Sequence, residues 1–348
     1  MAENILELKN LSVSINTPRG EVQAVRNVDL AVKPGEIVCI VGESGCGKTV
    51  MCSSVMKLMP RCASIKTGTI FLNGRDITNL KEREIRKIRG DDMTMVFQDP
   101  LTSLNPTIPV GKQISETILK HEKVSKDEAM NRSIEMLEMV GINNAKEMAG
   151  LAPHYFSGGM RQRCVLAVAL AAKPKLLFAD EITTALDVTV ASKVLDLLVE
   201  LRDKLDLSIV FISHDLGAVA RIADKVAVMY AGKIVEMGSA EEVFYDPRHP
   251  YTWGLLSCLP ALAIKRNEIN FIPGMPPSLI DPPKGDAFAV RNKYAMAIDY
   301  EEMPPLFKVS ETHWAATWLL DKRAPKVERP ILYRAQEESE NVEALEVL

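Results

Sequence analysis

The stretch that decides the fold is Ile37-Val-Cys-Ile-Val-Gly-Glu-Ser-Gly-Cys-Gly-Lys-Thr49, an apolar run followed directly by a glycine-rich loop. The run is apolar on both faces, which is typical of a central strand in a parallel sheet. The loop matches the P-loop pattern G-x-x-x-x-G-K-[ST], whose glycines allow tight turns that aim backbone N–H groups at phosphates. A helix-permissive stretch follows to about Met59, and its positive dipole end adds to the anion site. This stretch predicts a strand–loop–helix unit that binds a nucleotide.

Two side chains at the end of the loop carry most of its chemistry. Lys48 can neutralise the β- and γ-phosphate charges, and the Thr49 hydroxyl can ligate Mg²⁺. The residues that we expect to contact the nucleotide here are Gly42, Glu43, Ser44, Gly45, Cys46, Gly47, Lys48, Thr49 and Val50.

A second apolar run, Leu176-Leu-Phe-Ala179, ends in the acidic pair Asp180-Glu181. At the carboxyl end of a strand beside the P-loop, Asp180 can hold Mg²⁺ through water. Glu181 is then well placed to orient and polarise a water that attacks the γ-phosphate. The alternative is an ordinary acidic pair that ends a strand. Residues 188–204 look helical and residues 208–212 look like another buried strand, and this alternation predicts a parallel sheet with right-handed crossovers.

The segment Phe156-Ser-Gly-Gly-Met-Arg-Gln-Arg163 has the features of a second anion cradle. Ser157 would start a helix whose first N–H groups are free and not covered by bulky side chains. A protein with one P-loop has no obvious use for a second cradle in the same site. We therefore expect this cradle to serve the nucleotide of another subunit.

The rest of the chain divides by pattern. Residues 5–15 and 22–32 are rich in β-branched side chains and flank the turn Thr17-Pro-Arg-Gly20, whereas residues 105–150 show the three- and four-residue spacing of amphipathic helices. Twelve of the 20 prolines lie between residues 247 and 330, so long regular elements are not expected there. The predicted division is a nucleotide-binding domain (1–246) with a helical subdomain at about 99–165, a small separate extension (247–334) and an acidic, frayed tail (335–348).

Composition excludes several classes of protein. The formal net charge of -4 is no basic footprint of a dedicated nucleic-acid binder, so no nucleic-acid partner is expected. The longest apolar stretch, residues 164–172, is far below the roughly 18 residues that cross a bilayer, and the N-terminus has no secretory pattern. The cysteines show no C-x-x-C pair, and we expect them to be reduced, cytosolic and small core residues. They are Cys39, Cys46, Cys52, Cys62, Cys164 and Cys258.

Taken in order, these motifs resemble those of the ATP-binding subunits of ABC transporters. They are the P-loop, Val96-Phe-Gln-Asp-Pro100, Ser157-Gly-Gly-Met160, Ala179-Asp-Glu-Ile-Thr-Thr-Ala-Leu-Asp187 and Ser213-His-Asp215. The resemblance implies that Gln98 senses Mg²⁺ and the γ-phosphate and couples to a membrane subunit. It also implies that Asp187 communicates across a dimer and that His214 holds the γ-phosphate.

The fold and the full site follow from that resemblance. It implies an α/β P-loop NTPase with a RecA-like parallel core sheet, an N-terminal antiparallel β-subdomain and an inserted helical subdomain. The cofactors implied are ATP and Mg²⁺. The expected catalytic residues are Lys48, Gln98, Glu181 and His214; the expected Mg²⁺ ligands are Thr49, Gln98 and Asp180; the residues expected to act on the partner's nucleotide are Ser157, Gly158, Gly159, Met160 and Asp187.

Within that family the chain looks most like the oligopeptide and dipeptide importer group. The similarity rests on Phe97-Gln-Asp-Pro-Leu-Thr-Ser-Leu-Asn-Pro106, Phe156–Arg163, Asp246-Pro-Arg-His-Pro-Tyr-Thr252 and Ile272-Pro-Gly-Met-Pro-Pro277. In this group two ATPases form a pair, and the chain resembles the first of them, which has methionine rather than glutamine at the position of Met160. The resemblance implies a heterodimer with a sister ATPase, peripheral on the cytoplasmic face of the membrane. It also implies two membrane permease subunits and an extracellular peptide-binding protein.

Three departures from the pattern qualify the resemblance. Many relatives carry four extension cysteines that ligate an iron–sulfur cluster, and the corresponding positions here are Asp286, Asn292, Asp299 and Thr317. Oxygen ligands cannot replace four thiolates around such a cluster, so we predict none. Ile15 takes the place of an adenine-stacking aromatic residue, so adenine packing would be aliphatic and weaker. Ile182 stands where proline is common, and we expect little effect on the chemistry.

Other functions fit less well. A soluble ABC ATPase of DNA repair or chromosome structure would carry a long coiled coil between its half-motifs, but only 132 positions separate Lys48 from Asp180 and no heptad run intervenes. A small-molecule kinase would lack the Ser157 cradle. The cargo stays open between peptides and solutes such as nickel, because this subunit does not contact it.

Overall fold

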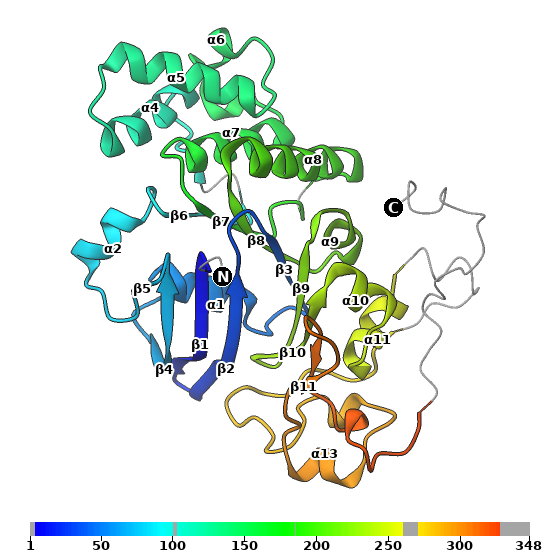
Figure 1. The fold of residues 1–348 in the computed structure, drawn as a ribbon. Helices are drawn as coiled ribbons and strands as arrows, with labels where there is room; N and C mark the ends of the chain where they lie inside the picture. Colours follow the sequence, from blue (N-terminus) through cyan, green and yellow to red (C-terminus); the bar gives the residue numbers. More distant parts are fainter. Residues whose placement is uncertain (1–3, 100–102, 185, 260–270, 328–348) are drawn as a thin grey trace, which may run out of the picture.

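The structure, a computed structural model, describes residues 4–99, 103–184, 186–259 and 271–327 (Figure 1). Parts of the segments named above lie outside the described residues. They include residues 100–102, which follow Gln98, then Ala185, and the predicted acidic tail. No helix within those ranges is both long and apolar enough to span a bilayer.

The core of the described chain is an eight-stranded sheet in the order β11-β12-β10-β9-β3-β8-β7-β6. Its parallel part consists of β9 (Lys225–Tyr230), β3 (Ile37–Val41), β8 (Ser208–Ser213), β7 (Leu176–Asp180) and β6 (Met93–Val96). Every residue of β3, β7 and β8 is buried, as expected for strands that are covered on both faces. The predicted parallel core with β3 near its centre is confirmed.

The sheet continues with three antiparallel strands that the sequence analysis did not predict. β10 (Lys233–Ser239) forms a hairpin with β9, because Ala231 and Gly232 both adopt positive φ, at 47° and 81°. The short strands β12 (Trp314–Ala315) and β11 (Phe307–Lys308) then pair beyond it. The core sheet is therefore mixed, and two of its strands come from the proline-rich extension.

A second sheet has the order β2-β1-β4-β5 and is antiparallel. It consists of β1 (Leu6–Thr17), β2 (Gly20–Val32), β4 (Ala63–Leu72) and β5 (Arg75–Asp76). Thr17 pairs with Gly20 across the predicted turn, so the N-terminal antiparallel β-subdomain is confirmed.

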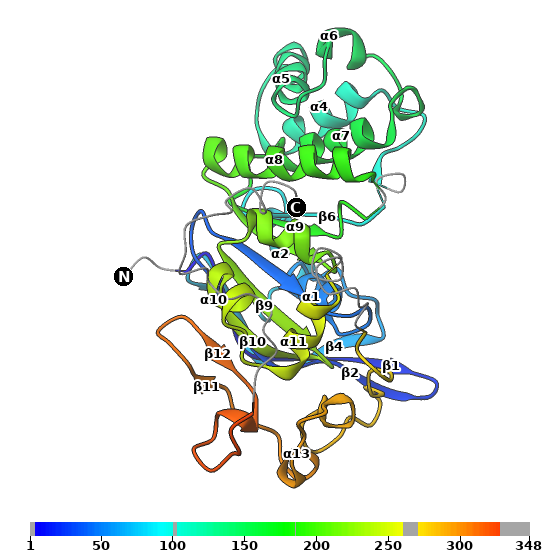
Figure 2. The same cartoon turned by 90° about the vertical axis from the view of Figure 1, so that its right-hand side faces the viewer.

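Helices α4 (Val110–His121), α5 (Lys126–Met139) and α6 (Ala145–Met148) gather at one end of the molecule. In both views α7 (Gly158–Leu170) and α8 (Val188–Leu205) lie between this group and the sheets (Figures 1 and 2). The periodic apolar residues Ile114, Ile118 and Leu137 are fully buried, as their spacing predicts.

Helix α1 (Lys48–Val55) begins at the phosphate loop as predicted but ends before Met59. The Lys57 backbone turns to a φ of 53°, and the Leu58 N–H donates to the Ser53 carbonyl at 2.9 Å. These features form a Schellman motif, which stops the helix. The remaining helices of the core are α2 (Glu82–Ile88), α9 (Leu216–Ile222) and α10 (Ala240–Tyr245), and a short 3-10 helix, η1 (Pro153–Tyr155), precedes α7.

The C-terminal extension is built from short elements, as its prolines predict. They are α11 (Pro250–Ser257), η2 (Ala289–Arg291), α13 (Ala297–Glu301) and η3 (Trp318–Leu320), together with β11 and β12. The extension is not structurally separate, because it adds strands to the core sheet and the Gln23 N–H of β2 donates to the Leu279 carbonyl at 2.8 Å.

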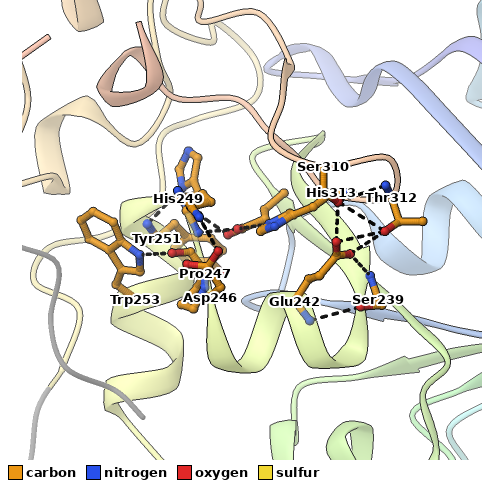
Figure 3. A network of polar contacts seen from close by, with 12 residues as sticks. Ser239, Glu242, Asp246, Pro247, His249, Tyr251, Trp253, Ser310, Thr312 and His313 are labelled. Atoms are coloured by element: carbon orange, nitrogen blue, oxygen red, sulfur yellow. Dashed lines mark hydrogen bonds and ion pairs between the residues drawn. The ribbon is translucent and has the colours of Figure 1, made fainter. Parts of the chain in front are cut away.

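A buried polar network fastens this extension to β10 (Figure 3). The carboxylate of Glu236, which is fully buried, accepts from the backbone N–H groups of Arg248 and His249 and contacts His313 Nε2 at 2.8 Å. Glu242 of α10 forms a second centre, where Ser310 and Thr312 donate to its side chain. Both carboxylates therefore connect the core to residues near β12.

All six cysteines are free. Four of them are buried, as predicted for small core residues: Cys39, Cys46, Cys52 and Cys164. The prediction was wrong for Cys62 and Cys258, which are exposed because both lie at the ends of elements, just before β4 and just after α11.

Candidate active site

The phosphate loop joins the carboxyl end of β3 to the first turn of α1. Gly42 and Gly47 are required by close approach as well as by their positive φ, whereas Gly45 has positive φ but open space around it. A Cβ on Gly42 would lie 2.1 Å from the Met229 carbonyl, and a Cβ on Gly47 would lie 2.1 Å from the Ala24 carbonyl. Strands β9 and β2 thus press against the loop from two sides and fix its path.

Lys48 folds back across the loop. Its ammonium donates to the carbonyls of Gly42 at 2.8 Å and Glu43 at 3.1 Å, and only 4% of the residue is exposed. Both acceptors are neutral carbonyl oxygens, and the Lys48 charge also acts electrostatically on the Asp180 carboxylate. A phosphate bound at this loop would place a negative charge next to the Lys48 ammonium.

Thr49 and Asp180 come together beside Lys48. The Thr49 hydroxyl donates to Asp180 Oδ1 at 3.1 Å, and Asp180 is 5% exposed. Burial raises the pKa of Asp180 and the neighbouring Glu181 charge raises it further, while the Thr49 hydrogen bond lowers it. A hydroxyl and a carboxylate are the hard oxygen donors that Mg²⁺ prefers, so this pair fits the metal implied by the sequence.

Three loops from neighbouring strands meet at the Glu181 carboxylate. Glu181 Oε2 accepts from Gln98 Nε2 at 3.2 Å and lies 3.4 Å from His214 Nδ1. Gln98 follows β6, Glu181 follows β7 and His214 follows β8, and these strands are adjacent in the sheet. The structure therefore brings together residues that are 83 and 33 positions apart in the chain.

The backbone at Glu181 is unusual. Its φ of 49° is left-handed, and its N–H donates to the Ile212 carbonyl at 2.9 Å. The hydroxyl of Thr184 also donates to Glu181 Oε2 at 3.5 Å, a contact that sequence reasoning missed. The sequence signal for this contact was the pair Thr183-Thr184, which lies two and three residues beyond Glu181.

Ser157 and Asp187 are N-caps of long helices. The Ser157 hydroxyl accepts from the Met160 N–H at 3.4 Å, and Asp187 Oδ1 accepts from the Val190 N–H at 3.0 Å. Both residues are exposed, and within the described ranges no hydrogen bond or ion pair joins either to the phosphate loop. The structure therefore does not bring them into the site formed by their own chain.

The two glycines after Ser157 differ in their surroundings. A Cβ on Gly159 would lie 2.4 Å from Val190 Cγ1 of α8, whereas a Cβ on Gly158 would meet nothing within 4 Å. Helix packing thus explains Gly159, but Gly158 faces open surface. A groove of about 440 Å³ next to His214 is lined on one side by the start of α8, where Val188 is 87% exposed.

Ile15 and Ile182 occupy different settings. Ile15 lies near the end of β1, pairs with Val22 and is half-buried. Ile182 is 1% exposed and belongs to the hydrophobic core directly behind Glu181. An apolar side chain at 182 therefore packs well without contributing a polar group to the site.

The four extension positions where thiolates were considered do not fit an iron–sulfur cluster. All four are buried, and each side-chain oxygen accepts a local backbone N–H. Asp286 accepts from Phe288, Asn292 from Tyr294, Asp299 from Met296 and Thr317 from Leu319. Within the described ranges there is no group of three or more His, Cys, Asp or Glu side chains placed to hold a metal. The absence of a cluster stays a prediction, and these caps support it.

The comparisons first define a class of protein. Residues 25–184 match the model of the ABC transporter family. The dimeric ATP-binding cassette MJ0796, bound to ADP and phosphate, superimposes with a TM-score of 0.61 at 26% identity, covering 68% of this chain and 98% of the cassette. CbiO1 of Clostridium perfringens gives a TM-score of 0.63 at 27% identity, covering 76% of this chain and all of that one. The phosphate loop, the acidic pair and the shared fold define an ABC-type ATPase that binds ATP.

The extension and the relatives then specify the family. Residues 235–298 match the oligopeptide/dipeptide transporter C-terminal region. The oligopeptide transport ATP-binding protein OppD of Bacillus subtilis is 55% identical over 95% of this chain and 93% of the relative. The dipeptide transport ATP-binding protein DppD of Lactococcus lactis is 54% identical, with 93% of each chain covered. This chain belongs to the ATP-binding subunits of oligopeptide/dipeptide ABC transporters, and it is the ATP-hydrolysing subunit of such a transporter.

Proposed function

We propose that this subunit powers peptide import by closing on ATP together with a second ATPase subunit and opening after hydrolysis. The observation that carries the catalytic part is the meeting of Gln98 and His214 at the Glu181 carboxylate. The three residues follow adjacent parallel strands, so all of them lie at the same edge of the sheet. We propose that this edge faces the γ-phosphate.

Each residue has a distinct task in this proposal. Lys48 exchanges its two carbonyl acceptors for the β- and γ-phosphates, where its charge is neutralised. Thr49, Asp180 and Gln98 would hold Mg²⁺, and the ion would supply positive charge that offsets the negative charge of the triphosphate. Glu181 orients and polarises the attacking water, and His214 donates a hydrogen bond to the γ-phosphate.

The second half of the site comes from the partner subunit. Ser157 and Asp187 are exposed helix caps and Gly158 faces open surface, and in the part of the chain that the structure describes none of them forms a hydrogen bond or ion pair with the phosphate loop of its own chain. An anion cradle of this kind, presented outward, suits the nucleotide held by another ATPase. MJ0796, a structural relative, is described as dimeric. We propose a heterodimer with a sister ATPase, consistent with Met160 as the fourth residue of the segment Ser157-Gly-Gly-Met160.

The transport assembly follows from the same family membership. We propose that two permease subunits bind near Gln98 and the helical subdomain at about 99–165, on the cytoplasmic face of the membrane. Exposed apolar side chains there, Phe97 at 40% and Tyr155 at 65%, suit such a contact. An extracellular peptide-binding protein would deliver the cargo. The proposed domain limits remain 1–246, 247–334 and 335–348.

The substitution Glu181→Gln tests the catalytic assignment in the assembled transporter. It should retain ATP binding while hydrolysis falls by about 10²–10⁴-fold, because the amide cannot polarise the attacking water. Glu200→Gln, an exposed change on α8, is the matched control. Near-normal turnover in Glu181→Gln would reject the assigned role.

Peptide-stimulated ATPase activity of the reconstituted complex tests the cargo. Stimulation by peptides, with none by nickel ions, is the expected result. Stimulation by nickel alone would replace peptide with metal as the cargo.

A further inference from the structure

The extension reaches the phosphate loop itself through Arg291. The guanidinium pairs bidentately with the Glu43 carboxylate, with Nη1 at 2.8 Å from Oε2 and Nη2 at 2.9 Å from Oε1. Glu43 is the second residue of the loop, and 248 positions separate the two partners. The Arg291 side chain is 5% exposed and the Glu43 side chain 25% exposed, so the contact is partly buried rather than a fully exposed surface pair.

Arg291 is held rigidly by the extension. Nε donates to the Pro273 carbonyl at 2.8 Å, and Nη2 also donates to the Ile272 carbonyl at 3.4 Å. Nη1 donates in addition to the Tyr230 hydroxyl at 3.2 Å, so five acceptors match the five N–H groups of a guanidinium. The Phe288 ring lies 5.9 Å from the guanidinium carbon. The place of the Glu43 carboxylate is therefore set mainly by residues of the extension, together with Tyr230 of β9 in the ATP-binding core.

The backbone of Glu43 is held at the same point. Its N–H donates to the Tyr251 hydroxyl of α11 at 2.8 Å, and its carbonyl accepts from Lys48 Nζ at 3.1 Å. One residue thus connects the extension on one side with the lysine of the phosphate loop on the other.

A glycine-rich phosphate loop is costly to order, so a contact that restrains it favours ATP binding. Gly42, Gly45 and Gly47 all have positive φ, and glycines lose more conformational freedom than other residues when a loop is ordered. The loop also carries a carboxylate at a place where a triphosphate must bind. Pairing with Arg291 compensates that negative charge, which would otherwise repel the phosphates.

We propose that Arg291 is a positioning residue for ATP binding, and that through the Glu43 pair the extension keeps the phosphate loop in its binding shape and compensates its negative charge. The extension and the nucleotide site are then energetically coupled. Loosening the extension would then weaken ATP binding, and bound ATP would in turn stabilise the contact between the extension and the loop.

The test measures ATP binding in EDTA by the assembled transporter, so that no hydrolysis takes place and the outcome does not depend on the role of Glu181. Arg291→Gln should weaken ATP binding about fivefold or more. With Mg²⁺ restored it should raise KM for ATP and leave kcat close to wild type. Arg323→Gln, which removes an exposed arginine from the same extension, is the control and should change neither. Equal ATP affinity in both variants would overturn the proposal.

A double-mutant cycle separates pairing from general damage. Glu43→Gln removes the repelling charge, so ATP should bind the double variant Glu43→Gln/Arg291→Gln more tightly than the two single effects predict. Effects that simply add would show that the pair does not act as a unit. If Arg291→Gln does not assemble, Arg291→Lys serves instead: it keeps the charge but not the bidentate contact. Wild-type affinity in both Arg291→Lys and Glu43→Gln would equally reject the positioning role.

Discussion

Replacing Glu236 by glutamine tests how firmly the extension is fastened to the core. The carboxylate is fully buried and hydrogen-bonds with three groups: the N–H of Arg248, the N–H of His249 and the His313 ring. The first and third meet Oε1 and the second meets Oε2. Glutamine has nearly the same shape but only one oxygen, so its NH₂ group must face at least one of these groups.

The expected cost follows from those contacts. One charge-assisted hydrogen bond, worth about 1.5–3 kcal/mol, is lost, and a buried N–H is left without an acceptor at about 1–3 kcal/mol. Glutamine regains part of this because an uncharged amide is easier to bury than a carboxylate. We expect the free energy of unfolding to fall by about 2–4 kcal/mol.

Two measurements report the effect. Urea unfolding gives the free energy, and hydrogen exchange locates the weakening at the Ala316 N–H, which donates to the Val235 carbonyl of β10 at 2.7 Å. Glu241→Gln, an exposed change on neighbouring α10, is the matched control. If both variants unfold with free energies within about 0.5 kcal/mol of each other, the network does not fasten the extension.

Two further predictions concern packing and pH. Gly159→Ala should destabilise the chain by about 1–3 kcal/mol, because its Cβ would lie 2.4 Å from Val190 Cγ1, whereas Gly158→Ala has open space around it and should change stability little in urea unfolding. Burial, with a smaller contribution from the nearby Asp299 charge, raises the pKa of Asp286 to about 6. Between pH 4 and pH 6 the folded state therefore binds more protons than the unfolded state, and the stability of the fold falls as pH rises. Asp286→Asn should therefore stabilise the protein by about 1–3 kcal/mol at pH 8 and bring no gain near pH 4; an equal gain at both pH values in urea unfolding would contradict this reasoning.

The sequence was sufficient where chemistry depends on short segments and on strand order. The loop at 42–49 and the acidic pair at 180–181 each follow a wholly apolar strand. Because parallel strands end at the same edge of a sheet, their proximity could be predicted from the chain alone. The contact between Thr49 and Asp180 is the structural result. The meeting of Gln98, Glu181 and His214 needed the family resemblance, because an isolated glutamine or histidine carries no local signal.

The sequence was insufficient where contacts are distant and lack a period. Strands β11 and β12 have two residues each, too few to show alternation, and they lie in a proline-rich segment. Nothing near Arg291 or Glu43 in the sequence indicates that the two side chains meet. A partly buried ion pair between remote residues is decided by tertiary packing, so only coordinates reveal it.

These distant contacts explain how an extension without cluster-binding cysteines can still act on the nucleotide site. At the four positions where many relatives carry cysteines, a side-chain oxygen accepts a hydrogen bond from a nearby backbone N–H. These hydrogen bonds hold the local turns that a cluster would otherwise hold. Glu236 ties the chain near β12 to β10. The rings of Tyr230, Tyr251 and Phe288 pack together with centroids 4.5–5.4 Å apart, directly beside the Arg291 guanidinium. Turn caps, a buried carboxylate and an aromatic cluster together hold one arginine against the phosphate loop, and for that task the thiolates are not required.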